Sequence, residues 1–209
     1  AAGLAHLGEK TLLVDVDPQG SVATSLGIQA ARSIQHVLVR DVPRSACVVH
    51  AKPNLDVIVS DETLAFAEIE LAKSDVATRH LKLTKALGGV RGYGYIILDC
   101  APALSIVNQN ALIFAGEVLV PVSCDYMALV GVHQLQRTLR RIGEQTGKSV
   151  RLAGVLPTFY DVRNRVCNDV LLHLRQVFGA RALPPVRVNT KIAEAPKHKK
   201  TIFEHAPDS

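Results

Sequence analysis

The sequence predicts an α/β fold in which a mostly parallel central sheet is flanked by helices on both faces. Apolar runs of four to eight residues recur along the chain, and longer segments with helical spacing separate them. The runs are nearly continuous in Val, Ile and Leu, which is typical of strands that are covered on both faces. A chain of 209 residues can bury a substantial core, so we expect one domain over residues 1–209.

Each expected strand is a short run rich in β-branched residues or Leu, and Gly, Pro, Asn or Asp bounds most of them. In chain order these strands are Thr11 to Val16, Leu55 to Ser60, Tyr95 to Asp99, Glu117 to Val122, Leu152 to Thr158 and Val186 to Val188.

Helices fill the intervals between the strands. A short helix should follow Pro18 and Gly20, where the chain turns after the first strand. Longer helices are expected at Ser33 to Val39, Asp61 to Leu87, Val107 to Ala115, Tyr126 to Thr146 and Arg163 to Phe178.

Both ends of the chain look cut. The opening AAGLAHLGEK resembles the second half of a helix, and the closing EHAPDS stops without a terminal element. We therefore expect a fragment truncated at both ends, with the central sheet incomplete.

Composition favours an ordinary globular protein and excludes several classes. No apolar run approaches the span of a bilayer, and no segment has the order of a signal peptide, so we expect a soluble cytoplasmic protein. The four cysteines show no CxxC spacing, which disfavours a disulfide framework or a zinc site. A net charge of +5 permits binding to nucleotides or nucleic acids without requiring either.

Polar and acidic residues gather at the ends of four predicted strands. Ligands of open parallel sheets bind beyond the carboxyl ends of the strands, so this edge is the candidate site. Each of these residues could alternatively cap a helix. They are Asp15 and Asp17, then Asp99, then Ser123 and Asp125, and finally Thr158, Tyr160 and Asp161.

Two acidic motifs favour a site for magnesium and phosphate. Asp99 ends the strand YIILD, as does the aspartate that holds Mg²⁺ in P-loop nucleotide triphosphatases; a loop aspartate capping the next turn is the alternative. We expect Asp15 and Asp17 to point to opposite sides of an extended chain, one toward the metal and the other toward a water near the terminal phosphate. An Asp-Pro turn would explain Pro18 and Gly20 but not the paired acids.

Five segments together resemble the successive motifs of the ParA/Soj partition ATPases, a deviant Walker-type branch of the P-loop NTPases in the MinD/ParA superfamily. They occur in the order and at the spacing of that family and cover nearly the whole chain. The segments are VDVDPQGSVATSLGI, YGYIILDCAPALSIVNQNAL, EVLVPVSCDYMALVGVHQL, GVLPTFYDVRN and NTKIAEAPKHKKTI.

The resemblance implies an ATPase with ATP and Mg²⁺ as cofactors. It also implies an ATP-dependent homodimer that binds duplex DNA without sequence preference, and a ParB-like partner that stimulates hydrolysis. Such a protein partitions plasmid or chromosomal DNA, is cytoplasmic, associates with the bacterial nucleoid and needs no membrane.

The resemblance also assigns roles to individual residues. Asp17 and Asp15 would be catalytic, with Asp17 orienting the attacking water and Asp15 near the Mg²⁺ shell. Asp99 would be the Walker B aspartate and contact the metal. The residues bordering the adenine would be Asn189, Thr158, Asp161, Ala195 and Pro196.

The chain departs from the family pattern in three ways. The glycine-rich KGGVGKT loop, whose backbone amides cradle phosphates, is absent, and truncation is the expected reason. The chain as given should therefore bind ATP poorly and be inactive. Ala101 replaces the usual proline after the Walker B strand, and the closing helix of the family is missing after Ser209.

The last third of the chain is distinctly basic and contains few aromatic residues, which favours phosphate contacts to duplex DNA over base stacking. For any single helix, a solvated charged face is the alternative. On the resemblance, Lys191 is the first expected DNA contact, followed by Arg163, Arg165 and Lys197.

Other functions remain open. A MinD-like membrane-associated regulator of cell division would need an amphipathic C-terminal helix, and a positioning ATPase could carry a cargo other than DNA. An iron–sulfur reductase would need cluster cysteines at defined loop positions, and Cys100 and Cys124 do not match that pattern. A degenerate scaffold without hydrolysis is disfavoured by Asp15, Asp17 and Asp99.

Overall fold

The computed structural model describes residues 1–102 and 105–209, without the side chains of residues 128–130, 132–136 and 145–146. The chain forms two compact units, one made of Ala1–Phe114 with Lys191–Ser209 and the other of Ala115–Thr190. The single domain expected from the sequence stays a prediction.

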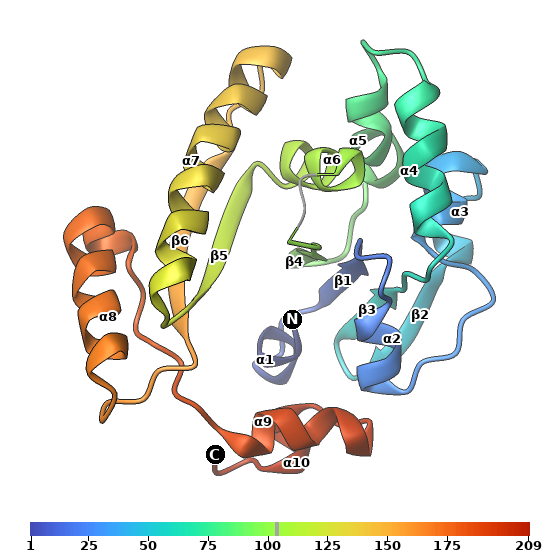
Figure 1. The fold of residues 1–209 in the computed structure, drawn as a ribbon. Helices are drawn as coiled ribbons and strands as arrows, with labels where there is room; N and C mark the ends of the chain where they lie inside the picture. Colours follow the sequence, from blue (N-terminus) through green and yellow to red (C-terminus); the bar gives the residue numbers. More distant parts are fainter. Residues whose placement is uncertain (103–104) are drawn as a thin grey trace. The chain divides into compact units, whose positions relative to one another are not determined.

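The first unit contains a four-stranded sheet in the order β2-β3-β1-β4. Strand β1 (Thr11–Asp15) lies between β3 (Leu55–Ile58) and β4 (Tyr95–Asp99) and is parallel to both. Strand β2 (Val48–Lys52) pairs antiparallel with β3 at the edge (Figure 1). The predicted mostly parallel sheet with helices is thereby confirmed.

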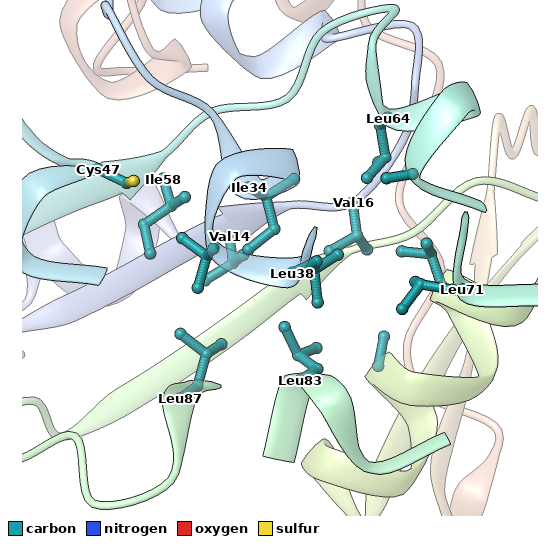
Figure 2. Close-up of a cluster of buried hydrophobic side chains, with 14 of the residues drawn as sticks. Val14, Val16, Ile34, Leu38, Cys47, Ile58, Leu64, Leu71, Leu83 and Leu87 are labelled. Atoms are coloured by element: carbon teal, nitrogen blue, oxygen red, sulfur yellow. The ribbon is translucent and has the colours of Figure 1, made fainter. Parts of the chain in front are cut away.

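Four helices contribute to the larger core of this unit: α3 (Ile34–Val39), α4 (Leu64–Lys73), α5 (Lys82–Leu87) and α6 (Ile106–Ala115). Side chains alternate along a strand, so Leu12 and Val14 of β1 point to the same face and meet these helices. Figure 2 shows part of the resulting cluster, which includes Val14, Val16, Ile34, Leu38, Ile58, Leu64, Leu71, Leu83 and Leu87.

The opposite face of the sheet carries a smaller core. Leu55, Val57 and Val59 form it with Ala5 of α1 (Ala2–His6) and Val22 of α2 (Ser21–Leu26). The C-terminal segment packs on the same helices: α10 (Ile202–His205) contacts α1, and the 3₁₀ helix η4 (Ala195–His198) contacts α2. The short α9 (Thr190–Glu194) leads into η4. Two layers of helices therefore enclose the sheet (Figure 1).

Two expectations for this unit need correction. The sequence prediction omitted β2, which Pro53 and Asn54 join to β3 in a tight turn, with Asn54 at φ 58°. The helix expected from Asp61 to Leu87 is broken at Ser74 and Asp75. The Asp75 carboxylate accepts hydrogen bonds from the backbone N–H of Ala77 and the hydroxyl of Thr78, which stabilises a turn instead of helix. Two further 3₁₀ turns are η1 (Arg44–Ala46) and η2 (Arg79–Leu81).

The second unit is a parallel strand–helix–strand motif with a further helix. Helix α7 (Tyr126–Thr146) connects β5 (Glu117–Ser123) to β6 (Arg151–Thr158), and α8 (Arg165–Phe178) follows, ending in η3 (Gly179–Arg181). Val122, Val155, Val170 and Leu174 form its core. No helix in the described part of the chain is long and apolar enough to cross a membrane.

The predicted strand from Val186 to Val188 is wrong. This segment makes only an isolated bridge between Tyr160 and Arg187, although it runs beside the end of β6. Pro184 and Pro185 precede it and lack the N–H groups that a strand ladder requires, so regular pairing does not form.

Candidate active site

The carboxyl ends of β1 and β4 bring two of the predicted acids together. Asp15 and Asp99 are direct Cα partners in the parallel register of these strands. The backbone N–H of Val16 donates to the carbonyl oxygen of Asp99 over 2.8 Å, which extends the pairing past the strand ends. Residues directly opposite in a parallel pair point to the same face, so both carboxylates lie on the face that carries α1 and α2.

Asp15 is buried and is fully engaged by backbone amides. Only 1% of the Asp15 surface is exposed to solvent. One carboxylate oxygen accepts from the N–H of Asp17 over 3.0 Å, and the other accepts from the N–H of Val22 over 3.2 Å. Asp15 therefore clamps the loop that connects β1 to α2.

Asp17 differs from Asp15 because the chain leaves the strand between them. The expectation that the two acids point to opposite sides of an extended chain is geometrically wrong, since residues two apart in a strand share a face. Instead β1 ends at Asp15, and Asp17 lies in the following turn, where its carboxylate accepts from the N–H of Gln19 over 2.9 Å. The turn leaves Asp17 partly accessible.

The three acids lie close enough to affect one another. Burial raises the pKa of Asp15, the amides of Asp17 and Val22 oppose this rise, and the charges of Asp99 and Asp17 add to it. Partial loss of solvation and the charge of Asp17 raise the pKa of Asp99. Partial loss of solvation and the charges of the same three acids raise the pKa of the Cys100 thiol to about 12. The site is thus a concentration of negative charge.

Glycine is required at position 20 to shape this loop. Gly20 adopts φ +61°, and a Cβ placed there would lie 2.7 Å from the backbone oxygen of Ser60. Only glycine adopts this conformation at little cost while allowing such a close approach. Gly20 thus lets the loop after Asp17 pass directly over the end of β3.

The acids fit a magnesium ion that keeps several waters better than they fit a metal site built from protein ligands alone. Among the described residues, no group of three or more His, Cys, Asp or Glu side chains is arranged to hold a metal. Mg²⁺ usually keeps several waters and takes only one or two carboxylates plus substrate phosphates. Asp99, whose carboxylate no described side chain neutralises by an ion pair, fits that role, and Asp15 stands beside it.

A hollow of about 380 Å³ within the first unit adjoins Asp99. Asp99 of β4 and the α2 residues Ser21 and Ser25 contribute its polar lining, and apolar side chains form the rest. The sequence offers no KGGVGKT loop to cradle a polyphosphate here. The residues present therefore fit the cation.

Two asparagines of α6 that the sequence reasoning did not single out anchor the chain, and one of them does so next to the site. Asn108 donates from its side-chain amide to the carbonyl oxygen of Ala101 over 2.6 Å, which holds the chain just after Asp99. Asn110 is fully buried, accepts from the N–H of Leu83 and donates to Arg79 and Ile106 carbonyls. Two asparagines in the apolar segment IVNQNALI are the signal that could have revealed them.

The residues expected near the adenine are divided between the two units. Thr158, Asp161 and Asn189 belong to the second unit, with Thr158 ending β6, whereas Ala195 and Pro196 belong to the first. Ala195 is buried. Their shared role stays a prediction.

Three of the four expected DNA contacts are engaged with acids of their own unit. The Arg163 side chain donates two hydrogen bonds to the Asp161 carboxylate, at 2.9 and 3.0 Å. These bonds hold the pKa of Asp161 at about 2. The Lys191 ammonium group lies 2.9 Å from the Glu194 carboxylate, and Arg165 lies 4.0 Å from Asp169. Lys197 forms no ion pair with a described residue.

Comparison with known proteins places the chain among partition ATPases. A family model described as an AAA domain matches residues 1–152. The chain is 37% identical to the chromosome partitioning protein ParA of Caulobacter vibrioides, over 96% of this chain and 77% of that protein. It is 36% identical to the sporulation initiation inhibitor protein Soj of Bacillus subtilis, over 100% of this chain and 84% of that protein.

A solved structure shares the fold closely. The chain has a TM-score of 0.81 and 31% identity to cobyrinic acid a,c-diamide synthase from Mycobacterium smegmatis with bound ATP analogue and magnesium, covering 99% of this chain and 87% of that one. These similarities lend no support to the expectation that the chain is a truncated and inactive fragment.

Proposed function

Because the chain belongs to the ParA/Soj family of partition ATPases, we propose that it hydrolyses ATP to control its binding to duplex DNA and so helps to partition plasmid or chromosomal DNA. The observation that carries the proposal is the convergence of Asp15, Asp17 and Asp99 at the carboxyl edge of a parallel sheet. Ligands of such sheets bind at this edge.

We assign a separate task to each acid. Asp99 directs its carboxylate to Mg²⁺, which when bound would neutralise charge that develops on the phosphates. Asp15 lies near the Mg²⁺ shell and fixes the loop by accepting hydrogen bonds from the amides of Asp17 and Val22. Asp17, at the accessible turn, accepts a hydrogen bond from the attacking water and orients it. Asn189, Thr158, Asp161, Ala195 and Pro196 border the adenine.

The proposal includes the partners that the family membership suggests. ATP promotes a homodimer, the dimer binds duplex DNA without sequence preference, and a ParB-like protein stimulates hydrolysis and release. Lys191, Arg163, Arg165 and Lys197 are the residues that contact the DNA in this proposal. The protein acts in the cytoplasm on nucleoid DNA, and a cargo other than DNA is the alternative within the same family.

The test is hydrolysis of ATP measured with and without Mg²⁺ and duplex DNA. We expect Mg²⁺-dependent turnover that Asp17→Ala and Asp99→Asn reduce by about 10²-fold or more, the usual size of a catalytic contribution of this kind. Glu70→Gln, an exposed change on α4, is the matched control and should keep full activity.

DNA binding is measured in parallel by the shift of a duplex at several salt concentrations. A salt-dependent shift that requires ATP supports the switch, and equal binding with and without ATP argues against it. Turnover that persists unchanged in Asp17→Ala would refute the assignment of the attacking water.

A further inference from the structure

The turn Lys197–Lys200 carries three lysines that no described acid neutralises. Lys197, Lys199 and Lys200 are exposed, and none forms an ion pair with a described residue. The acids on either side of the turn are engaged elsewhere, because Glu194 lies 2.9 Å from Lys191 and Glu204 lies 2.8 Å from Lys52. The turn therefore projects its positive charge into solvent.

The backbone of this turn is held in one conformation. The N–H of Lys199 donates to the carbonyl of Pro196 over 3.0 Å, and the N–H of Lys200 donates to the carbonyl of the buried Ala195 over 3.2 Å. Immediately after the turn, Thr201 caps α10 by accepting from the N–H of Glu204. A charged turn with fixed ends loses little conformational freedom when it binds.

Lys199 is in an unusual conformation that a close contact supports. Its φ is +55°, in the left-handed region that residues other than glycine rarely adopt. Its aliphatic stem lies against Gly27 at the end of α2, where an added Cβ would come within 2.5 Å of the Lys199 Cδ atom. Gly27 thus provides the space that lets the Lys199 stem lie flat while its ammonium group stays in solvent.

We infer that the turn Lys197–Lys200 is a contact surface for the phosphate backbone of duplex DNA. The inference rests on the proposed function and names a surface for its DNA partner. The turn contains no Phe, Tyr or Trp to stack on bases, and its one ring, that of His198, already stacks on His205 with the centroids 5.0 Å apart. It has no apolar side chain to insert into a lipid surface. Three exposed lysines on a backbone held by hydrogen bonds match repeated phosphates instead, and such contacts carry no sequence preference.

The test compares two triple variants with the same change in charge. The first combines Lys197→Gln, Lys199→Met and Lys200→Gln, in which methionine keeps a stem over Gly27. The control combines Lys73→Gln, Lys82→Gln and Lys85→Gln, which removes three lysines of α4 and α5. Anisotropy of a labelled duplex gives affinity against salt, and far-UV circular dichroism checks that each variant is folded.

We expect the turn variant to lower the slope of log affinity against log salt by about 2 to 3, near 0.9 for each lost phosphate contact. The control should change the slope by less than about 1. The inference is overturned if the turn variant keeps the wild-type slope, or if both variants lose affinity equally. In those cases wild-type DNA binding would leave the proposed function intact.

Two further outcomes distinguish a failure of this inference from a failure of the proposed function. A wild-type chain that binds no duplex at all overturns both this inference and the DNA part of the proposed function. Vesicles containing anionic phospholipid form a second arm of the experiment. If the three lysines support binding to vesicles but not to duplex, the surface is one for membranes and the inference is wrong.

Discussion

At the scale of single residues, Asp15 and Asp17 have different tasks despite their closeness in sequence. Asp15 is buried and accepts two backbone N–H groups, whereas Asp17 lies in the turn and accepts one. The sequence suggested that the roles differ but gave a wrong geometric reason. The actual reason, the end of β1 at Asp15, could not be read from an alternating pattern because strand ends depend on pairing with neighbours.

Replacing Asp15 should cost stability, whereas replacing Asp17 should not. Asp15→Ala leaves the N–H groups of Asp17 and Val22 without their acceptor, so we expect the free energy of unfolding to fall by about 1–3 kcal/mol. Asp17→Ala loses one exposed hydrogen bond and should stay within about 0.5 kcal/mol of wild type. Urea denaturation measures both, and equal losses would contradict the clamp.

Tyr93 offers a titration that reports a buried contact. Burial and its hydrogen bond to Asp56, 2.7 Å long, raise the pKa of Tyr93 to about 12. Because the pKa in the folded state is raised, this contact stabilises the protein fully below the ordinary tyrosine pKa and loses its effect as pH rises through about 12.

The pKa shift is measured by ultraviolet absorbance during alkaline titration. Wild type should show one tyrosine that ionises near pH 12, and Tyr93→Phe should lack that step. Tyr93→Phe should also lower the free energy of unfolding near pH 7 by about 1 kcal/mol. A normal titration of all tyrosines in the wild type would contradict the contact.

At the scale of elements, the sequence predicted the parallel strands better than the irregular segments. The runs at Tyr95 and Glu117 begin as expected, and α7 has the expected bounds, because the apolar pattern is the main sequence signal of element type. Strand β2 and the break after α4 depend on a tight turn at Asn54 and on hydrogen bonds of the Asp75 side chain. Such local chemistry competes with periodicity and is easily missed.

The loop before α2 should be sensitive to one glycine. Gly20→Ala forces a side chain into φ +61° and against the Ser60 backbone, so the unfolding free energy should fall by about 2 kcal/mol or more. Gly131 of α7 meets no described atom within 4 Å, so Gly131→Ala should stabilise by up to about 1 kcal/mol. Thermal unfolding that shows equal effects would contradict the close approach at Gly20.

The docking of α10 should depend on pH. Lys52 and the Thr201 backbone hold the pKa of Glu204 at about 2, below its ordinary value. The stabilisation is therefore complete above about pH 4.5 and disappears as pH falls toward 2. Since Glu204 is largely in solvent, the effect is below about 1 kcal/mol.

Hydrogen exchange of α10 amides at pH 5 and pH 3 measures this effect. Wild type should lose protection in α10 at the lower pH relative to its core strands, and Glu204→Gln should already be less protected at the higher pH. The same protection in both proteins at both values would contradict the tether.

At the scale of the whole molecule, the acidic rim and the basic turn share the first unit. The acids end β1 and β4, whereas Lys197–Lys200 closes η4 against α2, the helix that follows the acidic loop. The acids could be identified from the sequence because a polar residue directly follows or ends each apolar run. It could not reveal ion pairs such as Arg163–Asp161, because these depend on folded geometry, and the order of the expected DNA contacts stays a prediction.

The central claim is that Asp15, Asp17 and Asp99 form a rim of negative charge able to take Mg²⁺. Thermal unfolding against Mg²⁺ concentration tests it most directly in the wild type and in Asp99→Asn. Wild type should gain about 1.4 kcal/mol at ten times the dissociation constant. Asp99→Asn should be more stable than wild type without Mg²⁺, because less acidic charge is crowded together, and should gain nothing from the metal. Equal stabilisation of both proteins by Mg²⁺ would contradict the claim.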